Sequence, residues 1–270
     1  MSLPALQAAL RRGPSFSPFV VLGDPTPELS VTLARTAAEN GGDMLEIGFP
    51  YSDPVADGPA VQAAGFRSLA GGTSTRSALR LLGRIAAACP ETPLNLLVYG
   101  NLVHQIGWDR FAGEAVAAGA SSLLTPDIPL EEAGPLRRAS ERAGLGHVEL
   151  AGPLTPRQRL QRLAEAADFV YLAGFQGVTG VRSAGFQAMA DRLREAREQV
   201  GVPLCLGFGL SRREQITAAF AAGASIAVVG SHFARIVERI FRGPEDEERL
   251  LAAYAAAARR LAGRDGSTKN

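Results

Sequence analysis

The chain has 270 residues, 46% hydrophobic and 20% charged, which is enough for a sizeable core and is the usual length of one α/β barrel. A formal net charge of +1 gives no electrostatic reason to expect nucleic acid or an anionic membrane as a partner. No apolar run is long enough to span a bilayer, and the first residues lack the apolar region of a signal peptide, so we expect a cytoplasmic protein.

Short apolar segments alternate with longer amphipathic ones along nearly the whole chain. An extra amphipathic helix is expected at residues 3–12, covering the floor of the fold. Strands are expected at residues 17–23, 43–49, 93–99, 121–125, 145–151, 168–173, 202–208 and 224–230. Helices are expected at about residues 27–40, 58–70, 74–88, 107–118, 129–143, 156–165, 187–200, 211–222, 231–241 and 244–262.

Two helix starts carry specific signals. The helix expected at 129–143 would have Glu131 and Glu132 in its first turn, where acidic side chains suit the helix dipole. Ser211 is expected to cap the helix at 211–222.

Strands that alternate with helices indicate a parallel sheet, and eight of them favour a closed barrel over an open doubly wound sheet. We therefore expect a single domain over residues 1–270, a (β/α)8 TIM barrel with the extra N-terminal helix and short extra helices in the loops after the second and eighth strands. Active sites of such barrels lie where the strands end. Catalytic and binding residues are therefore expected within residues 48–58, 99–104, 127–129, 174–182, 207–211 and 230–233.

Several residue types point away from metal and cofactor chemistry. Cys89 and Cys205 have no metal-type spacing, and the three histidines lie far apart, so we expect no metal site. The only lysine is Lys269, next to the C-terminus. Because a Schiff base requires a lysine amine in the active site, imine-forming aldolase chemistry and pyridoxal phosphate held by this chain are both disfavoured.

The most informative segment lies at the end of the second expected strand. Alternation puts Leu45 and Ile47 on one face of the strand and Glu46 on the other. Since the apolar face suits the surrounding helices, Glu46 is expected to point into the barrel near its mouth. A buried carboxylate needs a partner or a proton, and perturbed carboxylates cluster at functional sites. Glu46 is therefore a candidate catalytic residue, with an internally hydrogen-bonded structural glutamate as the alternative.

Two aspartates follow in the next loop. Asp53 precedes a proline, which is typical of the start of a turn. Asp57 precedes Gly-Pro, which is typical of a helix cap. Each aspartate, taken by itself, remains open between a structural and a catalytic role.

Residues 46–59 (Glu-Ile-Gly-Phe-Pro-Tyr-Ser-Asp-Pro-Val-Ala-Asp-Gly-Pro) closely resemble the signature of tryptophan synthase α subunits. Further matches extend over nearly the whole chain, at residues 18–25, 99–103, 127–132, 177–180, 207–211 and 230–231. The resemblance implies cleavage of indole-3-glycerol phosphate to indole and glyceraldehyde 3-phosphate, with no cofactor in this chain. It also implies a partner, a pyridoxal-phosphate β subunit in a linear αββα assembly that receives the indole through a tunnel.

The resemblance also implies residue roles. Glu46 matches the general acid and base of the family, and Asp57 matches the aspartate that binds the indole nitrogen. Thr179 belongs to a lid loop that closes over the substrate and helps to order Asp57. The substrate-binding residues that it implies are Phe19, Tyr99, Tyr171, Thr179 and Phe208.

The reaction itself requires two carboxylates with different properties. Indole C3 must gain a proton, positive charge then appears on the ring nitrogen, and a side-chain hydroxyl must lose its proton as the carbon–carbon bond breaks. Glu46 can make both transfers if an apolar site raises its pKa. Asp57, kept ionised in a polar loop, would stabilise the developing positive charge.

Glycines in the last loops predict a site for the substrate phosphate. Gly180, Gly209 and the pair Gly230-Ser231 offer backbone N–H groups near a loop or helix start, which favours an anion. Phosphate sites in barrels commonly follow the seventh and eighth strands. Because each glycine alone is more typical of a plain turn, the prediction rests on their joint placement.

The sequence departs from the family pattern at two places. Phe175 stands where family members usually have arginine, which bears on lid closure and on communication with the partner. Residues 152–156 (Gly-Pro-Leu-Thr-Pro) differ from the commoner Ala-Pro-Thr form. Neither change touches Glu46 or Asp57, so activity remains the expectation.

Alternative functions remain open at this point. They are a free-standing lyase that releases indole to solution, an isomerase, an indole-glycerol phosphate synthase, and a non-catalytic activating subunit. The missing internal lysine weighs against the synthase, and the two carboxylates weigh against the isomerase. Residues 53–60 and 99–106 are the candidate partner-facing loops, which would favour the subunit over the free-standing lyase.

Overall fold

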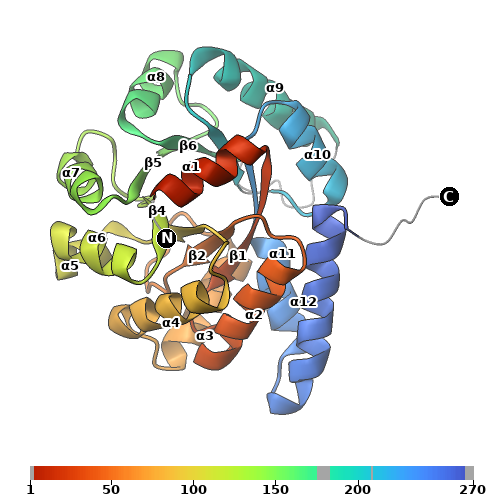
Figure 1. Cartoon of the computed structure of the whole chain (residues 1–270). Helices are drawn as coiled ribbons and strands as arrows, with labels where there is room; N and C mark the ends of the chain where they lie inside the picture. Colours follow the sequence, from red (N-terminus) through yellow and green to blue (C-terminus); the bar gives the residue numbers. More distant parts are fainter. Residues whose placement is uncertain (1–2, 175–182, 208, 265–270) are drawn as a thin grey trace.

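The structure is a computed structural model that describes residues 3–174, 183–207 and 209–264. Its strands β1 to β8 are parallel, pair in chain order and close into a barrel, because β8 also pairs with β1. Helices surround the barrel, and the N-terminal helix α1 crosses one end of it (Figure 1). The predicted (β/α)8 architecture is confirmed.

The strands are β1 (Ser15–Val21), β2 (Leu45–Gly48), β3 (Leu94–Leu97), β4 (Ala120–Leu124), β5 (Gly146–Ala151), β6 (Phe169–Ala173), β7 (Leu204–Gly207) and β8 (Ile226–Val229). The helices are α1 (Leu3–Arg12), α2 (Pro27–Glu39), α3 (Pro59–Ala70), α4 (Thr75–Ala88), α5 (Gly100–Ile106), α6 (Trp108–Ala117), α7 (Gly134–Ala143), α8 (Arg157–Ala166), α9 (Ser183–Gln199), α10 (Arg213–Ala221), α11 (Ser231–Ile240) and α12 (Glu247–Ala262), with a 3-10 turn η1 (Pro244–Asp246).

Apolar side chains form two layers, one inside the barrel and one between the strands and the helices. Leu45 and Ile47 pack in the outer layer, whereas Met44 packs inside with Phe19 and Tyr171. Period-two alternation in β2 therefore turns Glu46 inward, as predicted.

The floor of the barrel is closed by α1. Leu6 and Ala9 of this helix are buried in the same apolar cluster as the inward-facing strand residues. The backbone N–H of Leu3 donates to the carbonyl of Gly144, which fixes the start of the helix. The predicted extra N-terminal helix and its place are confirmed.

The helix α3, after β2, has 12 residues and matches the predicted range 58–70 to within one residue. Its first turn contains Pro59, whose fixed backbone angle suits that position. Residues 100–106, expected to be a loop, form the helix α5. After β8, α11 and α12 follow each other, as predicted.

Both predicted helix-start signals are wrong. The helix α7 begins at Gly134, followed by Pro135, so Glu131 lies in the preceding turn, where it pairs with Arg159 instead of the helix dipole.

The start of α10 lies two residues later than predicted. Arg212 occupies the capping position, and Ser211 lies outside the helix. The side chain of Gln215 instead reaches back and accepts from the N–H groups of Ser211 and Arg212, at 2.9 and 3.1 Å.

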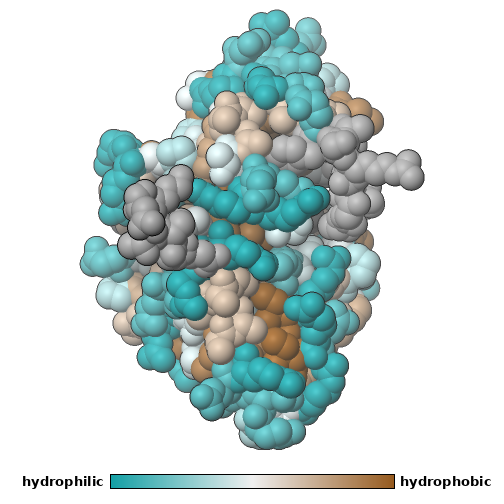
Figure 2. Space-filling model, turned by 90° about the vertical axis from the view of Figure 1, so that its right-hand side faces the viewer, coloured by the Kyte–Doolittle hydropathy of each residue, from teal (hydrophilic) through white to brown (hydrophobic). Residues whose placement is uncertain are grey.

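The outer surface over α10, α11 and α12 is mainly hydrophilic, with a narrow apolar strip (Figure 2). Among the residues that the structure describes, the large hydrophobic side chains that are exposed are Val55, Phe66 and Leu154. Within the same ranges, no helix is both long and apolar enough to cross a membrane.

Truncation of the floor residue Leu6 to alanine should lower the free energy of unfolding by about 2–5 kcal/mol, because it leaves a cavity in a fully buried site. Urea titration followed by circular dichroism would measure the loss. Gln7→Ala is the matched control, since Gln7 is exposed on the same helix and should change little. Equal effects of the two substitutions would contradict the proposed role of α1 as a packed floor.

Candidate active site

A pocket opens where the strands end and their loops begin. Its walls combine apolar side chains, two carboxylates and glycines of the last two loops. The lining residues are Phe19, Glu46, Asp57, Gly58, Val61, Leu97, Tyr171, Gly209, Leu210, Val228, Gly230 and Ser231. The sequence therefore predicted the right end of the barrel and several of its lining residues.

The carboxyl group of Glu46 is buried, with the residue only 4% exposed. Burial raises its pKa to about 8, and the neighbouring charge of Asp57 acts in the same direction. The hydroxyl of Tyr171, reaching across from β6, donates to Glu46 Oε2 at 3.3 Å and partly offsets the rise, because it stabilises the carboxylate. Glu46 is therefore mainly protonated at neutral pH.

The position of the Tyr171 ring depends on a small residue in the next strand. A Cβ atom on Gly207 would lie 1.7 Å from the Tyr171 hydroxyl oxygen, far inside contact distance. Only glycine leaves room at this place for the ring to reach Glu46. The close approach explains why β7 ends in glycine.

Asp57 is held by Tyr99. The hydroxyl of Tyr99 donates to Asp57 Oδ2 at 3.0 Å, and it accepts from the backbone N–H of Ala56 at 3.1 Å. Tyr51 stacks on the Tyr99 ring with the ring centroids 4.9 Å apart. Burial raises the pKa of Asp57 to about 6, and the Tyr99 hydrogen bond limits the rise. Asp57 is thus mostly ionised at neutral pH, although it is more desolvated than a polar loop suggested.

The alternative helix-cap role of Asp57 is wrong. The capping position of α3 is Gly58, and no side chain caps the helix. The backbone carbonyl of Asp57 accepts from Gln62 Nε2 at 2.8 Å, which leaves its carboxylate for Tyr99 and the pocket. Asp53, in contrast, is exposed and forms part of a turn, with its carbonyl accepting from Val55.

The pocket lining also includes a helix start. Gly230 holds the capping position of α11 without a side-chain cap, and Ser231 is the first helical residue. Gly209 lines the same pocket with φ +84°, a left-handed conformation that suits glycine. Backbone N–H groups at a helix N-terminus, together with the dipole, favour an anion.

The other predicted site residues divide into two groups. Phe19 lines the pocket, whereas Tyr99 is only 1% exposed and lies behind Asp57. Thr179, Gly180 and Phe208, together with Phe175 of the unusual loop, lie outside the described residues. Among the described residues, no three His, Cys, Asp or Glu side chains are placed to hold a metal ion.

Sequence reasoning missed the apolar lining of the pocket. Val61, Leu97 and Val228 line the pocket that also holds the two carboxylates and the helix start of α11. Inward-facing alternation in β3 and β8 could have found Leu97 and Val228. Val61 could not have been found in this way, because it lies on a helix, and the predicted helix range did not show which of its side chains meet the pocket.

Comparisons with known proteins agree with this geometry. A family model described as tryptophan synthase alpha chain matches residues 6–262. The tryptophan synthase alpha chain of Geobacillus kaustophilus is 42% identical over 253 residues, covering 92% of this chain and 94% of the relative. That of Shewanella oneidensis is 40% identical over 248 residues, covering 92% and 88%.

Solved structures give the same result. A chain from the tryptophan synthase α2β2 complex of Pyrococcus furiosus superposes with a TM-score of 0.82 at 29% identity, covering 93% of this chain and 98% of that one. The tryptophan synthase subunit alpha of Legionella pneumophila superposes with a TM-score of 0.84 at 29% identity, covering 98% of both chains. With the family model matching almost from end to end, this chain belongs to the tryptophan synthase alpha chain family.

Proposed function

We propose that the chain cleaves indole-3-glycerol phosphate to indole and glyceraldehyde 3-phosphate in tryptophan biosynthesis. The observation that carries the proposal is the presence, in one pocket, of two carboxyl groups whose pKa values differ, about 8 for Glu46 and about 6 for Asp57. Near pH 7 such a pair supplies one proton donor and one anion, which is the division of labour that this cleavage needs.

In the proposed reaction, Glu46 first donates its proton to indole C3. The ring then carries positive charge at its nitrogen, and the ionised Asp57 accepts the N–H hydrogen bond and stabilises that charge. Glu46, now a carboxylate, accepts the proton of the hydroxyl on the side-chain carbon that is bonded to C3. The carbon–carbon bond breaks, its electron pair returns to the ring, and an aldehyde forms. Glu46 ends as it began, protonated.

The two ends of the substrate match the two ends of the pocket. Phe19, Leu97 and Val228 offer an apolar surface to the indole ring between the carboxylates. Gly209, Gly230 and Ser231 offer backbone N–H groups to the phosphate at the start of α11. The carbon–carbon bond breaks with proton transfers alone and no external oxidant or reductant, so we propose that the chain needs no cofactor of its own.

We further propose that the chain works in the cytoplasm with a pyridoxal-phosphate β subunit in an αββα heterotetramer, to which it passes indole. The α2β2 complex of the P. furiosus relative supports this assembly. Val55 gives local support, because this apolar side chain is 74% exposed within the predicted partner-facing residues 53–60.

Glu46→Gln should lower kcat for indole release by at least about a thousandfold, because the amide can neither donate a proton to indole C3 nor accept one afterwards. Indole would be assayed with and without the cognate β subunit, and binding of the variant to that subunit would be checked by gel filtration. Wild-type turnover should rise strongly with the partner. High turnover without a partner would instead favour the free-standing lyase, and unchanged turnover in the variant would favour a non-catalytic activator.

The pH profile of kcat/KM should be a bell with limbs near 6 and 8. Activity falls below about pH 6 because Asp57 gains a proton, and above about pH 8 because Glu46 loses one.

Tyr171→Phe removes a hydrogen bond that stabilises the Glu46 carboxylate, so the pKa of Glu46 should rise and the upper limb of the pH profile should move to higher pH. Tyr51→Phe is the control and should leave that limb in place, since Tyr51 stacks on Tyr99 without touching Glu46. A downward move in the Tyr171 variant would contradict the assignment.

Ser231→Asp should raise KM by roughly tenfold or more, because a carboxylate at the start of α11 repels the substrate phosphate. The apparent kcat at saturation should change less, since the reacting carbon lies at the other end of the pocket. Ser74→Asp makes the same chemical change at the start of α4, where aspartate also caps well, and should leave KM unaltered. Steady-state kinetics would compare the two. A rise in KM for both, or for neither, would argue against a phosphate site at α11.

A further inference from the structure

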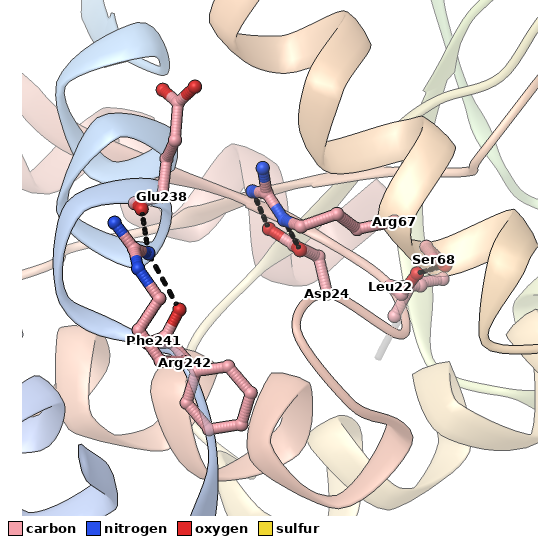
Figure 3. A network of polar contacts seen from close by, with 7 residues as sticks. All are labelled: Leu22, Asp24, Arg67, Ser68, Glu238, Phe241 and Arg242. Atoms are coloured by element: carbon pink, nitrogen blue, oxygen red, sulfur yellow. Dashed lines mark hydrogen bonds and ion pairs between the residues drawn. The ribbon is translucent and has the colours of Figure 1, made fainter.

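An arginine–aspartate pair joins the end of β1 to α3 behind the pocket (Figure 3). Asp24 is only 4% exposed, and its two oxygens accept from Arg67 Nε at 2.8 Å and Arg67 Nη2 at 2.9 Å. The guanidinium fork meets the carboxylate at both oxygens, so the contact fixes direction as well as distance. The reaction proposed above uses neither residue.

A second polar contact also links the turn after β1 to α3. Ser68 donates from Oγ to the carbonyl of Leu22 at 2.5 Å, within a buried site. Between Leu22 and Asp24, Gly23 has φ +82°, and a Cβ atom there would lie 2.5 Å from Ser68 Oγ and 2.1 Å from Thr73 Oγ1. The turn after β1 therefore lies directly against the last turns of α3.

The buried face of α3 consists of small side chains, namely Ala60, Ala64, Gly65 and Ser68. Small side chains give little interlocking with neighbouring elements, and apolar contact is not directional, so packing alone leaves the helix free to slide or turn. The pair formed by Arg67 and Asp24, together with the hydrogen bond from Ser68 to Leu22, supplies the directional contacts that apolar packing does not.

The position of α3 matters because its other end forms the pocket. Asp57 and Gly58 lead directly into the helix, and Val61 of its first turn lines the pocket. Beyond α3, Asp24 lies among side chains of two further helices, α11 and α12, including Phe233, Ala234, Val237 and Tyr254. The charge of Glu238 on α11 also contributes to raising the pKa of Asp24, after the larger effect of burial, whereas Arg67 lowers it.

We propose that Asp24 and Arg67 are positioning residues that set the register of α3 and thereby hold the Asp57 carboxylate against Tyr99 and the indole nitrogen. The proposal rests on the proposed function for its kinetic consequences. Its structural part concerns the surroundings of Asp57 alone and can be measured without turnover.

Asp24→Asn tests it, because asparagine keeps the size of the side chain but loses one acceptor and the charge. The variant should lose about tenfold or more in kcat, since small displacements of a positioned group cost that much. Its dissociation constant for inorganic phosphate should stay within about twofold of the wild-type value, because the start of α11 is the proposed phosphate site. Arg67→Lys, which keeps the charge, should lose less than Arg67→Gln.

Two controls separate positioning from loss of stability. Arg142→Gln breaks an exposed pair with Asp109 and should leave kcat unchanged. Leu160→Ala destabilises the fully buried packing of α8, away from α3, and should lower Tm without lowering kcat at 25 °C. If kcat in all variants simply followed Tm, the pair would be structural only and the proposal would fail.

A double-mutant cycle tests whether the pair acts through Asp57. Tyr99→Phe removes the other contact that holds this carboxylate. If both act on Asp57, Asp24→Asn should cost less in the Tyr99→Phe background than in the wild type. Additive losses would overturn the proposal.

The titration of Asp57, followed by carboxyl NMR in the free protein, gives a readout without turnover. Because burial is the largest cause of its raised pKa, a displaced Asp57 should titrate below the wild-type midpoint of about 6 in the Asp24→Asn variant. An unmoved midpoint would refute the positioning role. If the midpoint moved in the variant but the wild-type chain released no indole, the positioning role would stand and the proposed reaction would be refuted.

Discussion

The active-site chemistry depends on one constraint, the burial of the Glu46 carboxyl group inside the barrel. Water no longer stabilises its charge, so the proton stays on at neutral pH unless a partner compensates. Tyr171 compensates only in part, through one hydrogen bond of 3.3 Å. A carboxyl group that is neither fully charged nor permanently neutral can give a proton and take it back. Much of the surrounding structure keeps the group in this intermediate state.

The barrel achieves this state with backbone geometry. A strand buried on both faces must turn every second side chain inward, so the register of β2 decides that Glu46, and not Leu45 or Ile47, meets the pocket. Gly207 then leaves the space through which the Tyr171 hydroxyl reaches across. A shift of one residue in β2 would exchange the carboxylate for an isoleucine or a leucine.

Sequence patterns predicted most of this arrangement but not all of it. Alternation in β2 was sufficient to turn Glu46 inward, and eight apolar runs were sufficient for the barrel. Neither pattern shows which side chains far apart in the sequence come into contact. The hydrogen bonds between Tyr99 and Asp57 and between Arg67 and Asp24 therefore could not be predicted. Both join residues more than 40 positions apart, as the separations of 42 and 43 show. Helix starts failed for a local reason, because Pro135 begins α7 later than the acidic residues suggested.

The two carboxylates also act on each other. The charge of Asp57 raises the pKa of Glu46, so the ionised aspartate helps to keep the proton that the glutamate must donate. In the proposed reaction, transfer of that proton to the ring places a positive charge between two anions, which then stabilise it together. When the bond breaks, the ring becomes neutral again, and the repulsion between the carboxylates favours return of a proton to Glu46. The separation between Glu46 and Asp57 thus sets both the start and the end of the cycle, which is why the placement of α3, the helix that follows Asp57, matters to the chemistry.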